Sequence, residues 1–315
     1  MFEKRIKEIS KKFNNSSEKE FYILIHKKHR REIYFQNKKK ALDFIKIKFN
    51  SPLKRIIYFL IKIRLLQNFL KKIKLPQELG DVIFVGGQIK GFDLEKKIVI
   101  SFTKDSSDNK PFIKSKEFQK KVAKKDFAPE IFEINKKFPF SKEELLKEYD
   151  GRKDIEVFNR LQSYYKINRI KEITLKEYFE ILSKKLNKSR IKNSFVKGFL
   201  KNILSDYPND VKLKIVKLHG DFAKEQILLK NNNYIFTDWN NKRNIIIEDL
   251  VRFFGNEKDL LKNKHFNDIL KTYPEDVKKN IKLYLLLNET YNIIRREKVS
   301  KLSKERIKNI LGSKK

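Results

Sequence analysis

The sequence predicts an α+β protein in which a sheet-rich part precedes a helical part. At 315 residues with 40% hydrophobic side chains, the chain can bury a large core or fold as two lobes. Strand patterns dominate between residues 81 and 147, and helical periodicity dominates after Gly151. We therefore divide the chain into an N-terminal extension at 1–79, a β-rich lobe at 80–150 and a helical lobe at 151–315.

The extension is predicted to contain two short strands and two helices. The strands, at 21–25 and 32–35, are rich in aromatic and β-branched residues and flank a basic turn. A first helix is expected near 38–49. A second, at 53–74, has a serine N-cap and a proline in its first turn.

Three strand patterns follow one another after residue 80, and the turns that join them are very short. Such connections exclude parallel crossovers, so we expect an antiparallel meander. Its strands are predicted at 81–85, 88–94 and 98–103. A helix near 114–125 and short strands at 131–135 and 144–147 follow.

The helical lobe is interrupted by one segment with a strand pattern. That segment, 214–238, has the apolar runs and the central Asn-rich turn of a hairpin. The helices are predicted at 155–165, 174–186, 191–204, 277–297 and 303–310.

The composition excludes several classes of function. Zero Cys and four His exclude disulfides, thiolate metal sites and a histidine-rich metal centre. The net charge is +35, but the basic residues are spread along the chain. Compositional bias therefore explains the charge best, followed by attraction to anionic small molecules or lipid surfaces. Dedicated nucleic-acid binding is not expected, because the aromatic–basic signatures of RNA-binding modules are missing.

No apolar stretch reaches the roughly 18 residues that a membrane span requires. The start, MFEKRIKEISKKF, lacks the apolar core of a signal peptide, so we expect a cytoplasmic protein. Segment 53–75 is the one place that suits contact with an anionic membrane surface. Its basic residues fall on several faces of the predicted helix, which favours an internal helix instead.

The residues that carry chemistry gather around the predicted hairpin. A polar turn, His219-Gly220-Asp221, precedes it, Gln226 opens it, and Asp238 follows its second strand. The hairpin therefore places both acids at one end. A carboxylate on a turn, an amide and a second carboxylate are the groups that phosphoryl transfer needs: one acid orients the acceptor hydroxyl, and the others hold Mg²⁺ on the phosphates.

This segment resembles the catalytic region of the aminoglycoside phosphotransferase and choline kinase family. The family pattern of HGD, four residues and Asn, then Asp-Trp or Asp-Phe, is matched by His219-Gly220-Asp221, Gln226 and Thr237-Asp238-Trp239. The resemblance implies a two-lobed protein-kinase-like fold, here with an N-terminal α/β extension. It covers about residues 80–300 and is specific at 219–239.

The resemblance also implies a role for each matching residue. Asp221 would be the catalytic base, and Asp238 the principal Mg²⁺ ligand. Gln226 stands where the family has Asn, and its amide oxygen could serve the same metal through a longer side chain. Asp249 resembles the family's later Asp, which braces the catalytic loop, and His219 would support that loop rather than transfer protons.

The N-terminal half resembles a nucleotide-binding lobe more loosely. Gly86-Gly87, at the first turn of the meander, resembles the loop that covers ATP phosphates, although an ordinary β-turn explains the pair equally well. Glu117 resembles the family's helix Glu, and Glu148-Tyr149 resembles the hinge that meets the adenine. The sequence GGQIKG is not of the Walker type, so a P-loop fold is disfavoured.

The lysine that the family pairs with its helix Glu is displaced in this sequence. Spacing from Glu117 places Ser101 in that position, and Lys104 lies three residues on, facing the opposite side of the strand by alternation. Either a bulge redirects Lys104 to the phosphates, or another Lys serves, or the pair is missing. A surface role fits Lys104 equally well.

Together these features predict a phosphotransferase that uses ATP or GTP with Mg²⁺ and phosphorylates a hydroxyl of a small molecule. Sugars, amino sugars and precursors of glycan or lipid headgroups are the acceptor classes considered. The basic charge disfavours a polycationic drug and favours an anionic or neutral acceptor. The alternative is a pseudokinase or scaffold that binds nucleotide or a partner without turnover, suggested by Gln226 and the displaced Lys.

Overall fold

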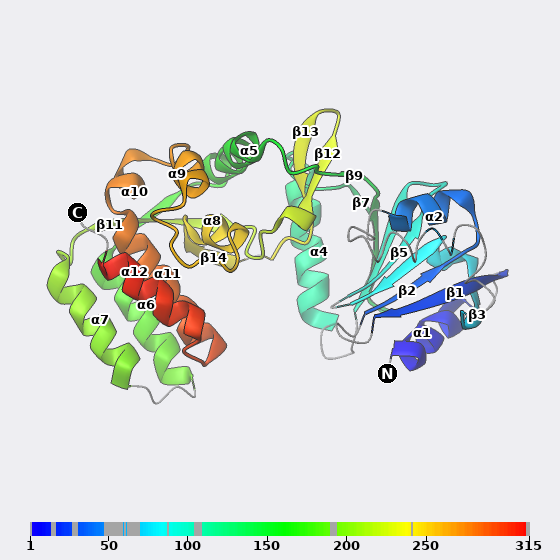
Figure 1. Ribbon diagram of the computed structural model, residues 1–315, viewed down its shortest axis with the longest axis horizontal. Coiled ribbons are helices and arrows are strands. Elements are labelled where there is room, and N and C mark those ends of the chain that lie inside the picture. The colour runs from blue at the N-terminus through cyan, green and yellow to red at the C-terminus, as the bar shows by residue number, and fades with distance from the viewer. Residues whose placement is uncertain are drawn as a thin grey trace. The chain divides into compact units, whose positions relative to one another are not determined.

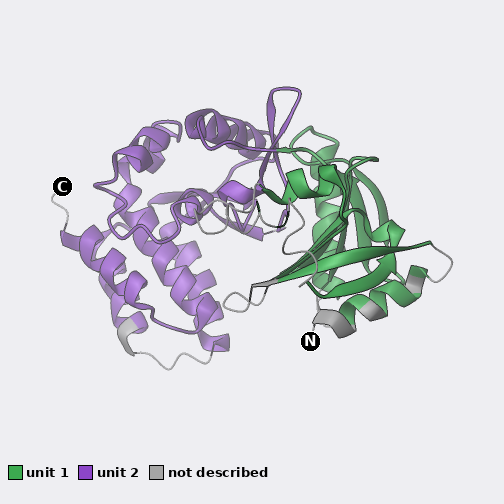
Figure 2. Ribbon diagram, turned by 45° about the vertical axis from the view of Figure 1, so that its right-hand side comes forward, with its two compact units in different colours: residues 1–147 green, residues 148–315 purple. Residues whose placement is uncertain are grey.

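The computed structural model describes residues 2–13, 17–26, 31–46, 59, 61, 70–86, 88–103, 109–189, 194–240 and 242–312. The chain divides into two compact units, unit 1 at Met1–Lys147 and unit 2 at Glu148–Lys315 (Figure 2). Unit 1 is built around one large sheet, and unit 2 is mainly helical (Figure 1). The predicted α+β class, with strands first and helices later, is confirmed.

The sheet of unit 1 has eight strands in the order β3-β1-β2-β4-β5-β6-β8-β7, each antiparallel to its neighbours. Its strands are β1 (Glu18–His26), β2 (Arg31–Phe35), β3 (Lys72–Pro76), β4 (Val82–Val85), β5 (Gln88–Asp93), β6 (Ile98–Thr103), β7 (Ile131–Asn135) and β8 (Phe140–Glu144). Because β2 pairs with β4, strands from the predicted extension and from the predicted β-rich lobe share one sheet.

Helices α1 (Phe2–Ser10) and α2 (Lys39–Lys46) cover opposite faces of this sheet (Figure 1). Successive strand residues point to opposite faces. Phe21 and Ile23 of β1 pack in one cluster with Ile9 of α1, whereas Tyr22 packs in another with Leu42 of α2. The sheet is therefore buried on both sides by apolar helix faces.

The prediction of a helix at 53–74 is wrong at its C-terminal end. Residues 72–76 form strand β3, which pairs with β1 from Glu18 to Tyr22. Helical periodicity continues into KIKLP, so a local pattern favours the helix, but long-range pairing with β1 decides the outcome. Most of segment 53–75, including the face considered for membrane contact, lies outside the described residues.

Unit 1 also contains helix α4 (Asn109–Ala123) and two short 3-10 turns, η1 (Lys11–Phe13) and η4 (Gln77–Leu79). Helix α4 packs next to β7. It begins five residues before the predicted start near residue 114, and it supplies the buried polar side chains described below with the site.

Unit 2 contains eight described α-helices. They are α5 (Asp154–Ile167), α6 (Leu175–Lys188), α7 (Ser194–Asp206), α8 (Glu248–Phe253), α9 (Lys264–Leu270), α10 (Glu275–Lys279), α11 (Ile281–Arg296) and α12 (Lys301–Gly312). The five long helices match the five predicted ones to within a few residues. Helix α11 is buried over most of its length, from Leu283 to Ile294, so it forms the centre of this unit.

Two small sheets complete unit 2. One has the order β10-β11-β14, and the other β13-β12-β9. Their strands are β9 (Lys147–Glu148), β10 (Lys171–Thr174), β11 (Lys212–Leu218), β12 (Ile227–Lys230), β13 (Asn233–Phe236) and β14 (Lys242–Ile245), and η6 (Lys224–Gln226) precedes β12. The predicted hairpin is confirmed as β12 and β13. In the part of the chain that the structure describes, no helix has the length and apolar character needed to cross a membrane.

Candidate active site

The polar turn predicted to carry the first catalytic acid follows strand β11. Gly220 adopts a left-handed conformation, with φ +87°, and a Cβ at this position would lie 2.9 Å from the carbonyl oxygen of Asn240. Glycine is therefore required both by the backbone conformation and by the close approach of a second chain segment. The tight turn leaves Asp221 exposed directly after it.

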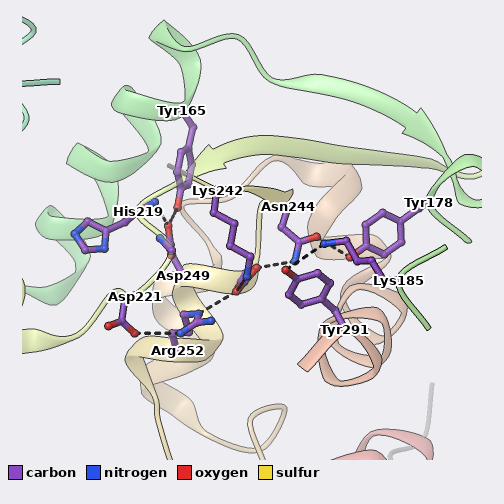
Figure 3. A network of polar contacts seen from close by, with 12 residues as sticks. Tyr165, Tyr178, Lys185, His219, Asp221, Lys242, Asn244, Asp249, Arg252 and Tyr291 are labelled. Carbon is purple, nitrogen blue, oxygen red and sulfur yellow. Dashed lines mark hydrogen bonds and ion pairs between the residues drawn. The ribbon is translucent and has the colours of Figure 1, made fainter. Parts of the chain in front are cut away.

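Asp249 of helix α8 holds this turn in place through hydrogen bonds (Figure 3). Its carboxylate accepts hydrogen bonds from the backbone N–H of His219, at 2.8 Å, and of Gly220, at 2.9 Å. The hydroxyl of Tyr165 donates a third, at 2.7 Å. Burial raises the pKa of Asp249, and these donors act in the opposite direction. The bracing role implied by the resemblance is confirmed.

His219 joins the turn to the segment that carries the second acid. Its ring Nε2 lies 2.6 Å from the carbonyl oxygen of Thr237, so Nε2 donates. The backbone N–H of Asn240 in turn donates to the carbonyl of His219, at 2.8 Å. Burial lowers the pKa of His219, so the imidazole is neutral at pH 7. His219 therefore supports the loop, as the resemblance implies.

The hairpin of β12 and β13 sets the position of Asp238. Asn231 and Asn232 form its two-residue turn with φ 49° and 65°, the geometry that matches the twist of paired strands. At the other end the N–H of Thr237 donates to the carbonyl of Gln226, at 2.9 Å. Asp238 follows with φ 61°, a conformation that is uncommon outside glycine.

The two predicted acids thus reach one region of unit 2. Both Asp221 and Asp238 lie close enough to His219 for their charges to raise its pKa against the larger effect of burial. Trp239, fully buried beside His219, anchors the segment by donating from its indole N–H to the carbonyl of Phe236, at 2.6 Å. The turn and the end of the hairpin are held together by the contact of the His219 ring with the Thr237 carbonyl and by the hydrogen bond from the N–H of Asn240 to the His219 carbonyl.

Gln226 lies in this region, but its amide already has a structural partner. Its Oε1 accepts a hydrogen bond from the backbone N–H of Ala223, at 2.9 Å, which closes the η6 turn. An amide oxygen has a second lone pair, so the contact leaves room for one further ligand. The role of Gln226 as a metal ligand remains a prediction.

Sequence reasoning missed Arg252, which contacts the candidate base (Figure 3). Its Nη1 lies 3.2 Å from Oδ1 of Asp221, while its Nε donates to the buried carboxylate of Glu248, at 3.0 Å. Lys242 and Asn244 also donate to Glu248. Burial alone would raise the pKa of Glu248, but Lys242 and Arg252 lower it. The sequence indicated only that Glu248 and Arg252, four residues apart on a helix, could contact each other.

The predicted nucleotide-binding residues of unit 1 are only partly described. Gly86 follows the end of β4, and an added Cβ would meet nothing within 4 Å, so packing does not require glycine there. Gly87 and Lys104 lie outside the described residues. Glu117 forms a partly exposed ion pair with Lys136, at 2.6 Å, rather than with a described strand lysine.

A buried Lys–Glu pair nevertheless exists in unit 1, with its partners on unexpected elements. Lys116 of α4 contacts Glu143 of β8, at 3.0 Å. Ser101 and Gln119 also donate to Glu143, at 2.9 Å and 2.6 Å, and all four side chains are buried. The lysine is thus on the helix, one residue before Glu117, and the acid is on a strand. Lys116 and Gln119 lie on the same helix face as buried Phe112. This spacing in the sequence could have indicated that both polar side chains are buried.

The predicted hinge residues lie at the start of unit 2. Glu148 is exposed in β9. The backbone N–H of Tyr149 donates to the carbonyl of Ile227, at 3.1 Å, and its hydroxyl donates to buried Asp154, at 2.8 Å. Asp154 also contacts His265, at 2.8 Å. The N–H of Tyr149 is therefore already engaged, and adenine contacts at the hinge remain a prediction.

Among the described side chains, no group of three or more His, Asp or Glu is arranged to hold a metal ion. Asp238 follows the Thr237 carbonyl that His219 contacts, and the N–H of Thr237 donates to the carbonyl of Gln226, so a carboxylate and an amide oxygen belong to this region. These are the hard donors that Mg²⁺ prefers, and Mg²⁺ commonly takes only one or two protein carboxylates and completes its shell with phosphate oxygens and water. The donor set therefore fits a nucleotide-bound Mg²⁺.

No protein-family model matches the sequence, and no curated protein matches it. The fold resembles several solved structures. Choline kinase LicA from Streptococcus pneumoniae gives a TM-score of 0.46 at 12% identity, covering 72% of this chain and 89% of that one. A thermostable mutant of aminoglycoside phosphotransferase APH(4)-Ia gives 0.43 at 10% identity, covering 73% and 89%. A choline/ethanolamine kinase family protein from Mesorhizobium loti gives 0.41 at 12% identity, covering 74% and 85%.

These proteins are of the class that the sequence motif resembles. The identities are far too low to transfer an activity or a substrate to this chain.

The buried pair in unit 1 gives a prediction for stability. Lys116→Met leaves Glu143 buried without its cation, so the free energy of unfolding should fall by about 3–5 kcal/mol. Lys120→Met, on the exposed face of the same helix, is the matched control and should change it by less than about 0.5 kcal/mol. The double variant Lys116→Met/Glu143→Gln should recover part of the loss. Urea unfolding followed by circular dichroism measures all four proteins; an unchanged Lys116→Met variant would contradict a buried ion pair.

The neutral imidazole gives a prediction for pH dependence. Because the folded-state pKa of His219 is lower than its unfolded value of about 6.5, the unfolded chain binds more protons below that pH, and His219 costs stability as the pH falls. His219→Gln keeps an N–H donor for Thr237 but does not titrate. Its stability relative to the wild type should therefore improve between pH 6.5 and 5, as measured by chemical unfolding. A difference that is constant across this range would refute a buried neutral His219.

Proposed function

We propose that this protein is a phosphotransferase that transfers a phosphoryl group from ATP or GTP to a hydroxyl of a small molecule. One observation carries the proposal: Asp249 holds the turn before Asp221 through two backbone N–H groups, while His219 of that turn bonds the carbonyl that precedes Asp238. This builds a support for two carboxylates that lie at the two ends of one turn–hairpin segment. Such preorganised pairs are what phosphoryl transfer requires, since its catalysis is mostly positioning and charge stabilisation.

Asp221 would act on the acceptor. Its side chain is 68% exposed, so a hydroxyl can reach it. The Nη1 of Arg252 lies 3.2 Å from Oδ1 of Asp221. That contact fixes the carboxylate orientation and leaves the second oxygen to accept the hydroxyl proton. The hydroxyl oxygen then forms the new bond to the γ-phosphorus, and the bond from that phosphorus to the leaving nucleoside diphosphate breaks. The hydroxyl proton passes to the Asp221 carboxylate.

Asp238 and Gln226 would hold Mg²⁺ against the nucleotide phosphates. When bound, the ion neutralises phosphate charge and so favours departure of the diphosphate. The left-handed backbone of Asp238 and the support of Trp239 fix the position of this carboxylate independently of any ligand.

The nucleotide contacts of Gly86, Gly87, Lys104, Glu117, Glu148 and Tyr149 remain proposals from the resemblance. Lys116 is not proposed as the lysine that meets the phosphates. At 1% exposure it is fully occupied by Glu143 and Gln119, and it supports the packing of α4 on the sheet.

A pseudokinase remains the second candidate, and one observation favours it. Ser101 of β6 stands where the resemblance expects the phosphate-binding lysine, and its hydroxyl donates to the buried carboxylate of Glu143. A chain with this arrangement could bind nucleotide without efficient turnover. The two candidates differ in whether product forms, not in whether nucleotide binds.

The proposal predicts the outcome of an acceptor screen with labelled ATP and GTP against sugars, aminoglycosides, choline and ethanolamine. With an accepted substrate, Asp221→Asn should lower kcat by about 10²–10⁴-fold, because it removes a proton acceptor without changing size. Asp238→Asn should abolish turnover that depends on Mg²⁺. Asp210→Asn, an exposed loop residue of unit 2, is the matched control and should keep full activity.

Nucleotide binding with no product from any acceptor would favour the pseudokinase. Equal turnover by Asp221→Asn and the wild type would refute the role of Asp221. Salt-sensitive RNA binding that both active-site variants retain would point instead to a nucleic-acid function.

A further inference from the structure

Asp154, the first residue of helix α5, is a buried acid whose side chain bonds segments outside its own helix. An acid in the first turn of a helix ordinarily interacts with the N–H groups of that turn. Here the side chain is 3% exposed, and its described hydrogen bonds go to three other segments of unit 2. A buried carboxylate is costly unless donors surround it, so these contacts constrain where the three segments can lie.

Each of the three segments supplies one donor to this carboxylate. The hydroxyl of Tyr149 donates to Oδ1, at 2.8 Å. The Nζ of Lys224, in the η6 turn, lies 3.2 Å from Oδ2, and the Nε2 of His265, in helix α9, lies 2.8 Å from the same oxygen. Burial, and next the hydrogen bond to Asp154, raises the pKa of Tyr149, so its phenol stays protonated and donates.

Lys224 differs from the other two donors because it belongs to the loop between the candidate base and the candidate metal ligand. It lies three residues after Asp221 and two before Gln226. Within this loop the N–H of Ala223 donates to Oε1 of Gln226, at 2.9 Å, and the N–H of Gln226 donates to the carbonyl of Ala223, at 3.0 Å. These bonds shape the loop, but they are internal to it.

Apolar packing holds the start of the loop. The ring of Phe222, next to Asp221, is buried and contacts the rings of Phe158 and Phe253. The Lys224 ammonium lies 5.2 Å from the ring centroid of Phe253, so attraction between the cation and the ring adds to its contact with the acid. The side chain of Lys224 is therefore directed to two partners outside the loop.

Tyr149 and Asp154 together hold the middle and the end of the loop. The N–H of Tyr149 donates to the carbonyl of Ile227, which follows Gln226, at 3.1 Å. The hydroxyl of the same tyrosine donates to Asp154, and Asp154 contacts Lys224. The contacts thus form a closed ring through Tyr149, Asp154, Lys224 and Ile227. Loss of the Asp154 charge would open this ring at Lys224, inside the loop.

We propose that Asp154 is a positioning residue for phosphoryl transfer: through Lys224 it holds the loop that runs from Asp221 to Gln226. Its role in the reaction rests on the proposed function, because transfer needs both ends of the loop in place at once. A displacement of about 1 Å can cost about 10²-fold in rate. His265 shares the carboxylate oxygen but lies on α9, so it supports the packing of α9 on α5 and does not hold the loop.

Hydrogen exchange of the full chain, followed by mass spectrometry in peptides that cover residues 221–227, tests the hold on the loop without any acceptor. The amides of Ala223 and Gln226 are hydrogen-bonded within the loop, so they exchange when it opens. Asp154→Asn and Lys224→Met should each speed this exchange about tenfold, and the double variant should exchange no faster than either single one. His265→Phe, the matched control, removes the other partner of the same oxygen and should stay within about twofold of the wild type.

Peptides from helix α11 report global unfolding and should exchange as in the wild type in every variant. Unchanged exchange of 221–227 in Asp154→Asn would overturn the proposal. An equal increase in His265→Phe would also overturn it, because the effect would then follow the packing of Asp154 and not its contact with the loop.

Turnover gives the second measurement, on any acceptor that the screen finds. Asp154→Asn and Lys224→Met should each lower kcat about tenfold and change the KM for the acceptor by less than about threefold. Lys224→Arg keeps a cation for Asp154 and should recover most of the rate. If Lys224→Met lowers kcat as much in the Asp154→Asn background as in the wild type, Lys224 acts independently of Asp154, and the proposal fails. If the loop loosens as expected but no acceptor is turned over, Asp154 holds the loop and the phosphotransferase function fails.

Discussion

The pair of hydrogen bonds from the backbone of His219 and Gly220 to the carboxylate of Asp249 is the constraint on which the site depends. A buried carboxylate is costly unless donors surround it, and here the donors are main-chain groups of the turn itself. The cost of burying Asp249 is thereby offset only when the turn has its folded shape. Gly220 is the residue that makes this shape accessible, since any side chain would collide with the carbonyl of Asn240.

From this constraint the rest of the site follows. His219, held by Asp249, reaches Thr237 and so fixes the segment that carries Asp238. Helix α8, which supplies Asp249, also supplies Glu248 and Arg252, so the same six-residue helix braces the turn and contacts Asp221. The turn and the contact with Asp221 therefore both depend on one short element.

Much of this could be predicted from the sequence, because the signals were local. The HGD turn, the Asn-rich hairpin turn and the long amphipathic helices depend on neighbouring residues, and each appears where it was expected. Strand β3 and the Lys116–Glu143 pair could not be predicted, because both depend on partners more than 25 residues away in the sequence. Arg252 was missed for the same reason: its contact with Asp221 joins residues 31 apart.

In the proposed function, Asp238 holds a metal ion on the nucleotide while Asp221 acts on the acceptor. The affinity of a non-hydrolysable ATP analogue, measured by calorimetry with and without Mg²⁺, separates these roles without any knowledge of the acceptor. Mg²⁺ should tighten binding to the wild type and to Asp221→Asn, but have little effect on Asp238→Asn. The same Mg²⁺ effect in all three proteins would contradict this expectation.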